Sequence, residues 1–355
     1  MNQKIRVLVV DDSAIVRKIL TDVLSSQADI EVVGTAPDPF VARDKILALD
    51  PDVLTLDIEM PRMDGLSFLK RVMKYRPMPV IVISSLAQSG CAKAIEAMEC
   101  GAVDVLPKPG GPYSVGDLQL VLAEKVRSAA QARLRVGLQS KTAEAGTHIR
   151  TALKTNGAQR ALIAIGASTG GTEAIRAILE QLPEQIPPVV IVQHIPPIFS
   201  RAFADRLDRT CRIRVKEATD GDELTAGLAL IAPGDIHMLV RKRGEQFRVE
   251  LKQGPRVCYQ RPSVDVLFQS VADAAGSSAA GVLLTGMGAD GAQGLLRMKQ
   301  AGAFTMAQDE ATSVVYGMPR EAARLGAADL ILPLPEIAAA ICRAVEEPAA
   351  GKAAC

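Results

Sequence analysis

The stretch ALIAIGASTGGTEAI, at residues 161–175, contains a buried strand, a glycine-rich turn and the start of a helix. Its first five residues form a continuous apolar run, which is typical of a strand covered on both faces of a parallel sheet. Residues 166–171 then read GASTGG, and a helical pattern over residues 172–182 follows this turn. The stretch therefore predicts one strand–turn–helix unit of an α/β domain.

The same alternation of strands and helices continues along the C-terminal half. Strands are expected at 189–192, 228–231, 281–284, 304–307 and 330–332, and helices at 199–208, 264–275, 291–301, 319–325 and 335–346. Residues 237–240 and 247–251 flank the polar segment RKRGE and predict a β-hairpin. We expect residues 161–348 to form an α/β domain with a mostly parallel sheet and a β-hairpin, followed by a tail at 349–355.

The N-terminal half has its own strand and helix series. Strands are expected at 5–10, 30–34, 53–56, 80–83 and 103–106, and helices at 14–24, 40–48 and 115–136. This pattern predicts a five-stranded, doubly wound α/β domain over residues 1–136. Residues 137–160 lose the periodicity and are rich in Thr, Ala, Gly and charge, so we interpret them as a linker.

Composition excludes several classes of protein. The 355 residues are enough for about two domains. Lys plus Arg (41) nearly balances Asp plus Glu (40), and Trp is absent, which argues against nucleic-acid binding. No apolar run reaches the roughly 18 residues of a membrane span, and the N-terminus shows no signal peptide. The six cysteines have no C-x-x-C spacing, so we expect reduced thiols and a cytoplasmic protein.

Polar residues follow four strands of the N-terminal domain. Asp11 and Asp12 end the first strand, Asp57 ends the third, Ser84 follows the fourth and Lys108 follows the fifth. These ends meet at one edge of a doubly wound sheet, where three carboxylates repel one another unless a cation offsets their charge. Oxygen ligands of this kind suit Mg²⁺. The cluster predicts phosphoryl transfer to Asp57, with Ser84 bonding a phosphoryl oxygen.

The N-terminal domain resembles the receiver domains of two-component signalling. The resemblance is carried by VLVVDDS at 7–13, LTLDIEMPRMDG at 54–65, ISS at 83–85 and the Lys-Pro pair at 108–109. It implies that a histidine kinase supplies the phosphoryl group to Asp57. It also implies that Ser84 and Lys108 serve as the switch hydroxyl and the switch lysine.

The receiver resemblance extends to the metal. It implies Mg²⁺ held by Asp12, Asp57 and the backbone carbonyl of Glu59, with Asp11 in support. Many receivers carry an aromatic switch residue three positions before the lysine, whereas this chain has Val105. That departure argues against a rotating aromatic ring in the switch and leaves the chemistry unchanged.

The glycine-rich turn of the second domain places Ser168 at the sharp end of a strand. Its spacing is G-x-S-x-G-G, whereas a dinucleotide-binding turn has G-x-G-x-x-G, so Ser168 replaces a glycine that lets backbone approach a pyrophosphate. A serine beside a helix N-terminus is well placed to be a nucleophile, with helix N–H groups near a developing oxyanion. A nicotinamide-dependent oxidoreductase is the disfavoured alternative.

A serine nucleophile needs a base, and the chain has three histidines. His194 ends the next strand, in VVIVQHIPP, and is expected at the same sheet edge as Ser168. His148 lies in the linker, and His237 begins a hairpin strand, where a structural role is the expectation. We predict that His194 is the base.

The third member of a triad is a carboxylate that orients the imidazole. Asp290 follows the strand GVLLTG in a glycine-lined loop and is the preferred candidate, although it could instead cap the helix after it. Asp235, in a turn beside His237, and Asp265, early in a helix, are weaker candidates.

The second domain resembles the catalytic domain of the chemotaxis protein-glutamate methylesterase (CheB) family. The matching motifs are GASTGG, QHIP, APGDIHM, RPSVDVLF, LTGMGADG and YGMPREA. The resemblance implies catalytic Ser168, His194 and Asp290, the N–H of Met287 at the oxyanion, and no cofactor in this domain. It implies demethylation of glutamate methyl esters on chemoreceptors, with deamidation of glutamines.

The two domains together imply a phosphorylation-regulated hydrolase. We hypothesise that the unphosphorylated receiver covers the Ser168 face and that phosphorylation of Asp57 releases it. A response regulator with a DNA-binding output is the non-enzyme alternative. It is disfavoured because no compact helix-turn-helix follows the linker and the net charge is only +1.

Overall fold

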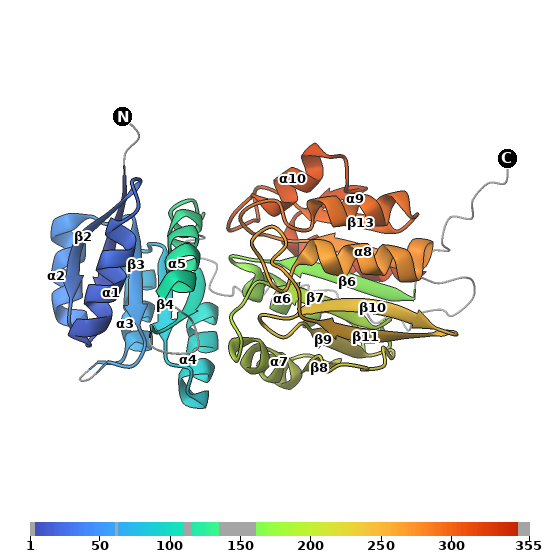
Figure 1. Ribbon diagram of the computed structural model, residues 1–355, viewed down its shortest axis with the longest axis horizontal. Helices are drawn as coiled ribbons and strands as arrows, with labels where there is room; N and C mark the ends of the chain where they lie inside the picture. The colour runs from blue at the N-terminus through green and yellow to red at the C-terminus, as the bar shows by residue number, and fades with distance from the viewer. Residues whose placement is uncertain (1–3, 61–62, 110–114, 135–160, 347–355) are drawn as a thin grey trace. The chain divides into compact units, whose positions relative to one another are not determined.

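The computed structural model describes residues 4–60, 63–109, 115–134 and 161–346. The chain divides into two compact units, Met1–Gln139 and Ser140–Cys355. Each unit has a parallel sheet with helices packed against it, as Figure 1 shows. The predicted linker at 137–160, with His148, and the predicted tail at 349–355 lie outside the described residues.

The first unit is the predicted five-stranded doubly wound domain, with sheet order β2-β1-β3-β4-β5 and every pair parallel. Its strands are β1 (Ile5–Val10), β2 (Ile30–Ala36), β3 (Val53–Asp57), β4 (Val80–Ser84) and β5 (Asp104–Pro107). Its helices are α1 (Ala14–Ser25), α2 (Pro39–Leu49), α3 (Gly65–Tyr75), α4 (Gln88–Glu99) and α5 (Val115–Ala130). The continuous apolar runs of β3 and β4 are buried throughout, as strands between two helical layers must be.

The second unit contains a seven-stranded sheet of order β14-β13-β12-β6-β7-β9-β8, in which every pair is parallel. Its strands are β6 (Leu162–Ala167), β7 (Val189–Gln193), β8 (Arg214–Glu217), β9 (Leu228–Ile231), β12 (Ala279–Leu283), β13 (Phe304–Gln308) and β14 (Leu330–Leu332). The expected α/β architecture is confirmed. The strand β8 was not predicted, because its sequence RVKE has a single apolar residue at a sheet edge.

The hairpin is confirmed as a separate two-stranded sheet of β10 (His237–Arg243) and β11 (Gln246–Lys252). Its strands extend further than predicted and leave only Gly244 and Glu245 in the turn. The helices of this unit are α6 (Gly171–Leu179), α7 (Phe199–Thr210), α8 (Val264–Ala275), α9 (Ala292–Gln300), α10 (Met318–Arg324) and α11 (Leu334–Glu346), with the 3-10 turn η1 (Gly276–Ser278). Helix α8 packs on both α9 and β10, and this packing positions the functional site.

Two further observations bear on the sequence predictions. No helix among the described residues combines the length and apolar character needed to cross a bilayer. Within the same residues, Cys91, Cys100, Cys211, Cys258 and Cys342 are all free thiols.

Candidate active site and phosphorylation site

The candidate active site lies at the carboxyl ends of three neighbouring strands of the second sheet. The strands are β12, β6 and β7, and β6 lies between the other two. Ser168 follows β6, His194 follows β7, and Asp290 lies in the loop after β12. Because the chain leaves β6 toward one neighbour and later returns on the other side, this edge is a topological switch point, where α/β sheets bind ligands.

The turn that carries Ser168 is bonded to the strand ends on both sides. The N–H of Ser168 donates to the carbonyl of Thr285 (3.0 Å), in the loop after β12. The carbonyl of Ser168 accepts from the side-chain amide of Gln193 (2.8 Å), the last residue of β7. These bonds fix the backbone of Ser168, a buried residue just before the start of α6.

His194 is oriented from both its backbone and its ring. The parallel register pairs Ala167 with Gln193, so Ser168 and His194 occupy the next positions along the two strands. The N–H of His194 donates to the carbonyl of Ala167 (3.1 Å). Its Nε2 lies 2.8 Å from Oδ2 of Asp290, whereas its buried Nδ1 has no hydrogen-bond partner among the described residues. Nδ1 is therefore the ring nitrogen that is free to accept a proton.

Asp290 is held by the N-terminus of α8. Its carboxylate accepts from the hydroxyl of Ser263 (2.7 Å) and from the N–H groups of Val264 (2.7 Å) and Asp265 (3.1 Å). Burial acts to raise the pKa of Asp290, but the hydrogen bond and charge of His194, with the α8 donors, lower it below the usual value. The alternative that Asp290 caps the following helix is wrong, because α9 has no side-chain cap.

The two weaker carboxylate candidates are occupied elsewhere. Asp235 forms an ion pair with Arg261 at 2.9 Å and is partly exposed. Asp265 is buried, but its Oδ1 accepts from the N–H of Gly294 (2.6 Å) in α9. Of the candidates in the described residues, Asp290 is the one hydrogen-bonded to His194.

His237 is bonded through both ring nitrogens. Nδ1 accepts from the N–H of Ser263 (3.2 Å), and Nε2 lies 2.9 Å from the carbonyl of Pro255. The side chain is buried at the start of β10. It holds two segments of backbone together, in agreement with the structural role expected of it.

The loop of Met287 lies against the turn that carries Ser168. A Cβ atom on Gly286 would lie 2.6 Å from Cβ of Ser168, so only glycine permits this approach. The carbonyl of Gly286 accepts from the N–H groups of Gly317 (3.1 Å) and Met318 (2.8 Å), which anchors the loop from its other side. This places the backbone next to Met287 in contact with the Ser168 side chain.

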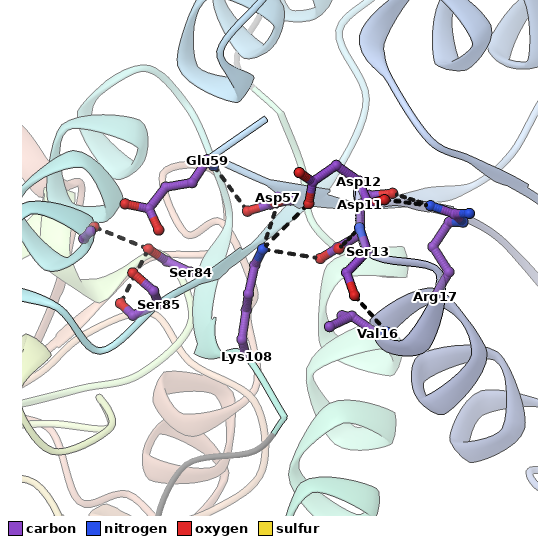
Figure 2. A network of polar contacts seen from close by, with 11 residues as sticks. Asp11, Asp12, Ser13, Val16, Arg17, Asp57, Glu59, Ser84, Ser85 and Lys108 are labelled. Atoms are coloured by element: carbon purple, nitrogen blue, oxygen red, sulfur yellow. Dashed lines mark hydrogen bonds and ion pairs between the residues drawn. The ribbon is translucent and has the colours of Figure 1, made fainter. Parts of the chain in front are cut away.

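The carboxylate cluster of the first unit surrounds one ammonium group, as Figure 2 shows. Nζ of Lys108 lies 2.7 Å from Asp57, 3.6 Å from Asp11 and 4.0 Å from Asp12. Burial raises the pKa of Asp57 to about 6, although the hydrogen bond from Lys108 opposes that shift. Burial lowers the pKa of Lys108, but its bond to Asp57 and the nearby carboxylates raise it overall.

The cluster fits a hard divalent cation. One carboxylate oxygen from each of Asp11, Asp12 and Asp57 lies within 4.8 Å of the others. Oδ2 of Asp11 is buried without a hydrogen-bond partner in the part of the chain that is described. The other oxygens of the two buried carboxylates are oriented by backbone, since Ser13 N–H donates to Asp11 and Glu59 N–H donates to Asp57, each at 2.9 Å. An all-oxygen donor set of this kind is what Mg²⁺ prefers.

The predicted switch hydroxyl, Ser84, and the departure from the receiver pattern, Val105, lie on the neighbouring strands β4 and β5. Ser84 is buried at the end of β4, and its hydroxyl donates to the carbonyl of Gly90 (3.0 Å) in α4. Val105 is buried within β5, where it pairs with Val82.

Comparisons with known proteins match both units. A CheB methylesterase family model covers residues 163–341, and a response regulator receiver domain model covers residues 7–116. A protein-glutamate methylesterase/protein-glutamine glutaminase of Syntrophus aciditrophicus is 56% identical over 96% of this chain and 99% of its own length. The chain belongs to the CheB methylesterase family.

Other members of the CheB family are similarly close. A protein-glutamate methylesterase/protein-glutamine glutaminase of Anaeromyxobacter dehalogenans is 53% identical over 97% of this chain and 96% of its own length. The crystal structure of the Thermotoga maritima CheB methylesterase catalytic domain aligns with a TM-score of 0.51 and 36% identity, covering 53% of this chain and 98% of that one.

Sequence reasoning missed the residues that hold the candidate triad of this CheB family member. Ser263 lies within RPSVDVLF, a motif that was noted without a role for its serine. The available signal was a serine directly before a helical run, which is a typical N-cap. The sequence does not indicate that this N-cap contacts Asp290, because the two residues are 27 positions apart.

Proposed function

We propose that the protein is a chemoreceptor methylesterase and glutaminase that uses Ser168 as nucleophile, His194 as base and Asp290 as the orienting carboxylate. The observation that carries the proposal is the His194 ring, whose Nε2 is bonded to buried Asp290 and whose Nδ1 is left without a partner in the described chain. The relatives named above act on protein glutamyl esters and glutamines, which supports the same substrates here.

The proposed reaction proceeds through an acyl-enzyme. Nδ1 of His194 takes the proton of Ser168 Oγ as this oxygen bonds to the ester carbonyl carbon. The N–H of Met287 donates to the oxyanion that forms. The carbon–oxygen bond to the methoxy group breaks, and the departing methoxy oxygen takes the proton from His194 and leaves as methanol. Water then attacks the acyl group by the same route and releases a glutamate carboxylate; with an amide substrate the leaving group is ammonia.

Asp290 contributes by orienting His194 and by stabilising its charged form. Because its pKa is lowered below the usual value, Asp290 is ionised at neutral pH. The carboxylate therefore accepts from Nε2–H both before and after Nδ1 takes the serine proton. The donors of α8 hold it in that position.

The decisive experiment is methanol release from methylated chemoreceptor membranes. The wild-type chain is expected to release methanol, and Ser168→Ala is expected to lose about 10³-fold or more of that rate. Mass spectrometry of the receptor peptides reports glutamine-to-glutamate conversion in the same reactions. Equal methanol release by the two proteins would remove Ser168 from the mechanism.

We also propose that Asp57 accepts a phosphoryl group from a histidine kinase and that this stimulates the esterase. Asp11, Asp12, Asp57 and the carbonyl of Glu59 would hold Mg²⁺, which offsets charge on the phosphoryl group. Lys108, 2.7 Å from Asp57, supplies a second positive charge, and Ser84 is the hydroxyl for a phosphoryl oxygen. Since its proposed substrates are cytoplasmic receptor helices, the protein works in the cytoplasm.

The regulatory proposal is tested on the full chain with a small phosphodonor such as acetyl phosphate. The phosphodonor with Mg²⁺ should raise methanol release by the wild type and leave Asp57→Asn unchanged. Phosphate incorporation at Asp57 without any change in esterase rate would contradict coupling between the two units.

A further inference from the structure

A second histidine is linked to the triad carboxylate through one intervening residue. The ring of His237 accepts a hydrogen bond at Nδ1 from the N–H of Ser263 (3.2 Å) and donates from Nε2 to the carbonyl of Pro255 (2.9 Å). A backbone N–H can only donate and a carbonyl can only accept, so these partners require the neutral tautomer with its proton on Nε2. The ring is buried, which leaves these as its two polar contacts among the described residues.

Ser263 connects that histidine to the active site. Its backbone N–H is bonded to His237, and its hydroxyl donates to Oδ1 of Asp290 (2.7 Å). Ser263 is also the N-cap of α8, whose next two N–H groups donate to the same carboxylate. A shift of this single residue would therefore move most of the donors that orient Asp290.

We propose, on the basis of the proposed function, that His237 is a positioning residue for ester hydrolysis. Through Ser263 it fixes the first turn of α8. This holds Asp290 in the orientation in which its carboxylate accepts a hydrogen bond from Nε2–H of His194. His237 touches neither substrate nor reacting atoms. Its effect is on the rate of the chemical step, because a misplaced Asp290 no longer holds the His194 ring toward Ser168.

The proposal separates two functions of the His237 ring. His237→Asn places an amide oxygen where Nδ1 lies and keeps the acceptor for Ser263. His237→Gln places an amide nitrogen near Nε2 and keeps the donor to Pro255 without that acceptor. The two variants therefore differ in which partner they retain.

A matched control comes from the same pair of elements. Ser270 of α8 also bonds the hairpin, since its hydroxyl accepts from the N–H of Val240 (2.9 Å) in β10. Ser270→Ala loosens the contact between α8 and β10 two turns away from Asp290. Any loss caused by general weakening of this packing must appear in Ser270→Ala as well as in the His237 variants.

The test measures kcat and KM for methanol release by the full chain, with Tm from circular dichroism. We expect His237→Gln and His237→Ala to lower kcat by roughly 10²-fold and to leave KM nearly unchanged. A loss of this size is typical when a catalytic group is displaced by about 1 Å. His237→Asn should recover most of that loss, and Ser270→Ala should lower Tm without lowering kcat. Ser263→Ala should lower kcat and add little to His237→Gln, because both variants act through the orientation of Asp290.

Three outcomes would overturn the proposal. These are unchanged kcat in His237→Ala, equal or better activity of His237→Gln relative to His237→Asn, and an equal loss of kcat in Ser270→Ala. Should His237→Ala fail to fold, the comparison of Asn with Gln decides the question.

Covalent labelling of Ser168 distinguishes a failure of the His237 role from a failure of the proposed triad. The rate at which a fluorophosphonate labels Ser168 depends on the triad but needs no receptor substrate. No labelling of wild-type Ser168 would contradict the proposed triad itself. Normal wild-type labelling with equal rates in all His237 variants would contradict only the role of His237.

Discussion

Asp265 and Asp290 each accept hydrogen bonds from the N-terminal turn of the other's helix. Asp290 lies just before α9 and accepts from two N–H groups of α8. Asp265 lies in the first turn of α8 and accepts from the N–H of Gly294 in α9 (2.6 Å). Helix N-termini carry unpaired donors and partial positive charge, which stabilise carboxylates there. The orientation of Asp290, the carboxylate of the proposed triad, therefore depends on how α8 packs against α9.

Only one of these two carboxylates touches His194, which gives a matched pair of variants. Asp290→Asn is expected to lower kcat by about 10³- to 10⁴-fold, because the amide cannot hold the imidazole in the required tautomer. Asp265→Asn keeps an oxygen for Gly294 and should lower kcat by no more than a few fold. Methanol release from methylated receptors measures both. The reverse ranking would transfer the triad role to Asp265.

Gly286 is expected to be essential for activity. A methyl group there would lie 2.6 Å from Cβ of Ser168 and 2.3 Å from Sδ of Met318, so Gly286→Ala must push aside the turn of Ser168 or the loop of Met287. A displacement of about 1 Å predicts a loss of roughly 10²-fold in kcat. Steady-state kinetics on receptor membranes checks this.

Gly281→Ala is the control for crowding as such. Its Cβ would lie 2.9 Å from Cδ1 of Leu295, within β12 and away from the turn of Ser168. This variant should lower Tm with little change in kcat. If both glycine variants lost activity in proportion to stability, the close approach at Gly286 would have no specific role in catalysis.

The stability of the first unit should depend on the protonation of Asp57. Burial raises its pKa from 3.8 to about 6, so the folded chain binds this proton more tightly than the unfolded chain. The resulting contribution to the free energy of unfolding is complete below about pH 4 and is lost as the pH rises through about 6. It amounts to roughly 3 kcal/mol without divalent cations.

Hydrogen exchange of β1 peptides in the presence of a chelator measures this effect. The opening free energy of the wild type should fall relative to Asp57→Asn between pH 4 and pH 6, because the amide has no charge to bury. A constant difference between the two proteins across that range would show that Asp57 keeps an ordinary pKa.

Mg²⁺ should stabilise the same unit. A cation that binds only the folded state adds about 2.7 kcal/mol when its concentration is a hundred times the dissociation constant. The protection of β1 should therefore rise with Mg²⁺ in the wild type and much less in Asp12→Asn. Asp44→Asn, which removes an exposed carboxylate paired with Arg43, is the control and should respond like the wild type. Equal responses in all three proteins would exclude Asp12 as a ligand.

Most strands of both sheets could be predicted from sequence because they are continuous apolar runs, and β8 is the exception. β3 and β4 are buried along their full length, as their mostly apolar sequences predict. The predicted helix at 172–182 is present but ends at Leu179, and the one at 115–136 ends at Ala130. Helix ends depend on local capping and packing, which periodicity alone does not report.

The candidate residues could also be selected from sequence. Parallel strands bring their carboxyl ends to one edge, so Ser168 and His194 were expected together before any side-chain geometry was known. Asp290 was already preferred over Asp235 and Asp265 on its place in the loop after a strand, but the contacts made by the two weaker candidates appear only in the tertiary structure. Asp235 pairs with Arg261, and Asp265 accepts from the N–H of Gly294 in α9, and neither contact follows from the local sequence pattern.

Sequence by itself therefore determined two parallel α/β units and the residues at their strand ends. Continuous apolar runs indicate buried strands, and their alternation with helices indicates that the strands are parallel. Tertiary structure alone decided that Nε2 of His194 faces Asp290 and that Ser263 lies between His237 and that carboxylate. These bonds join residues 26 to 96 positions apart. Such contacts depend on how helices and strands pack in three dimensions, and short-range periodicity carries no record of that packing.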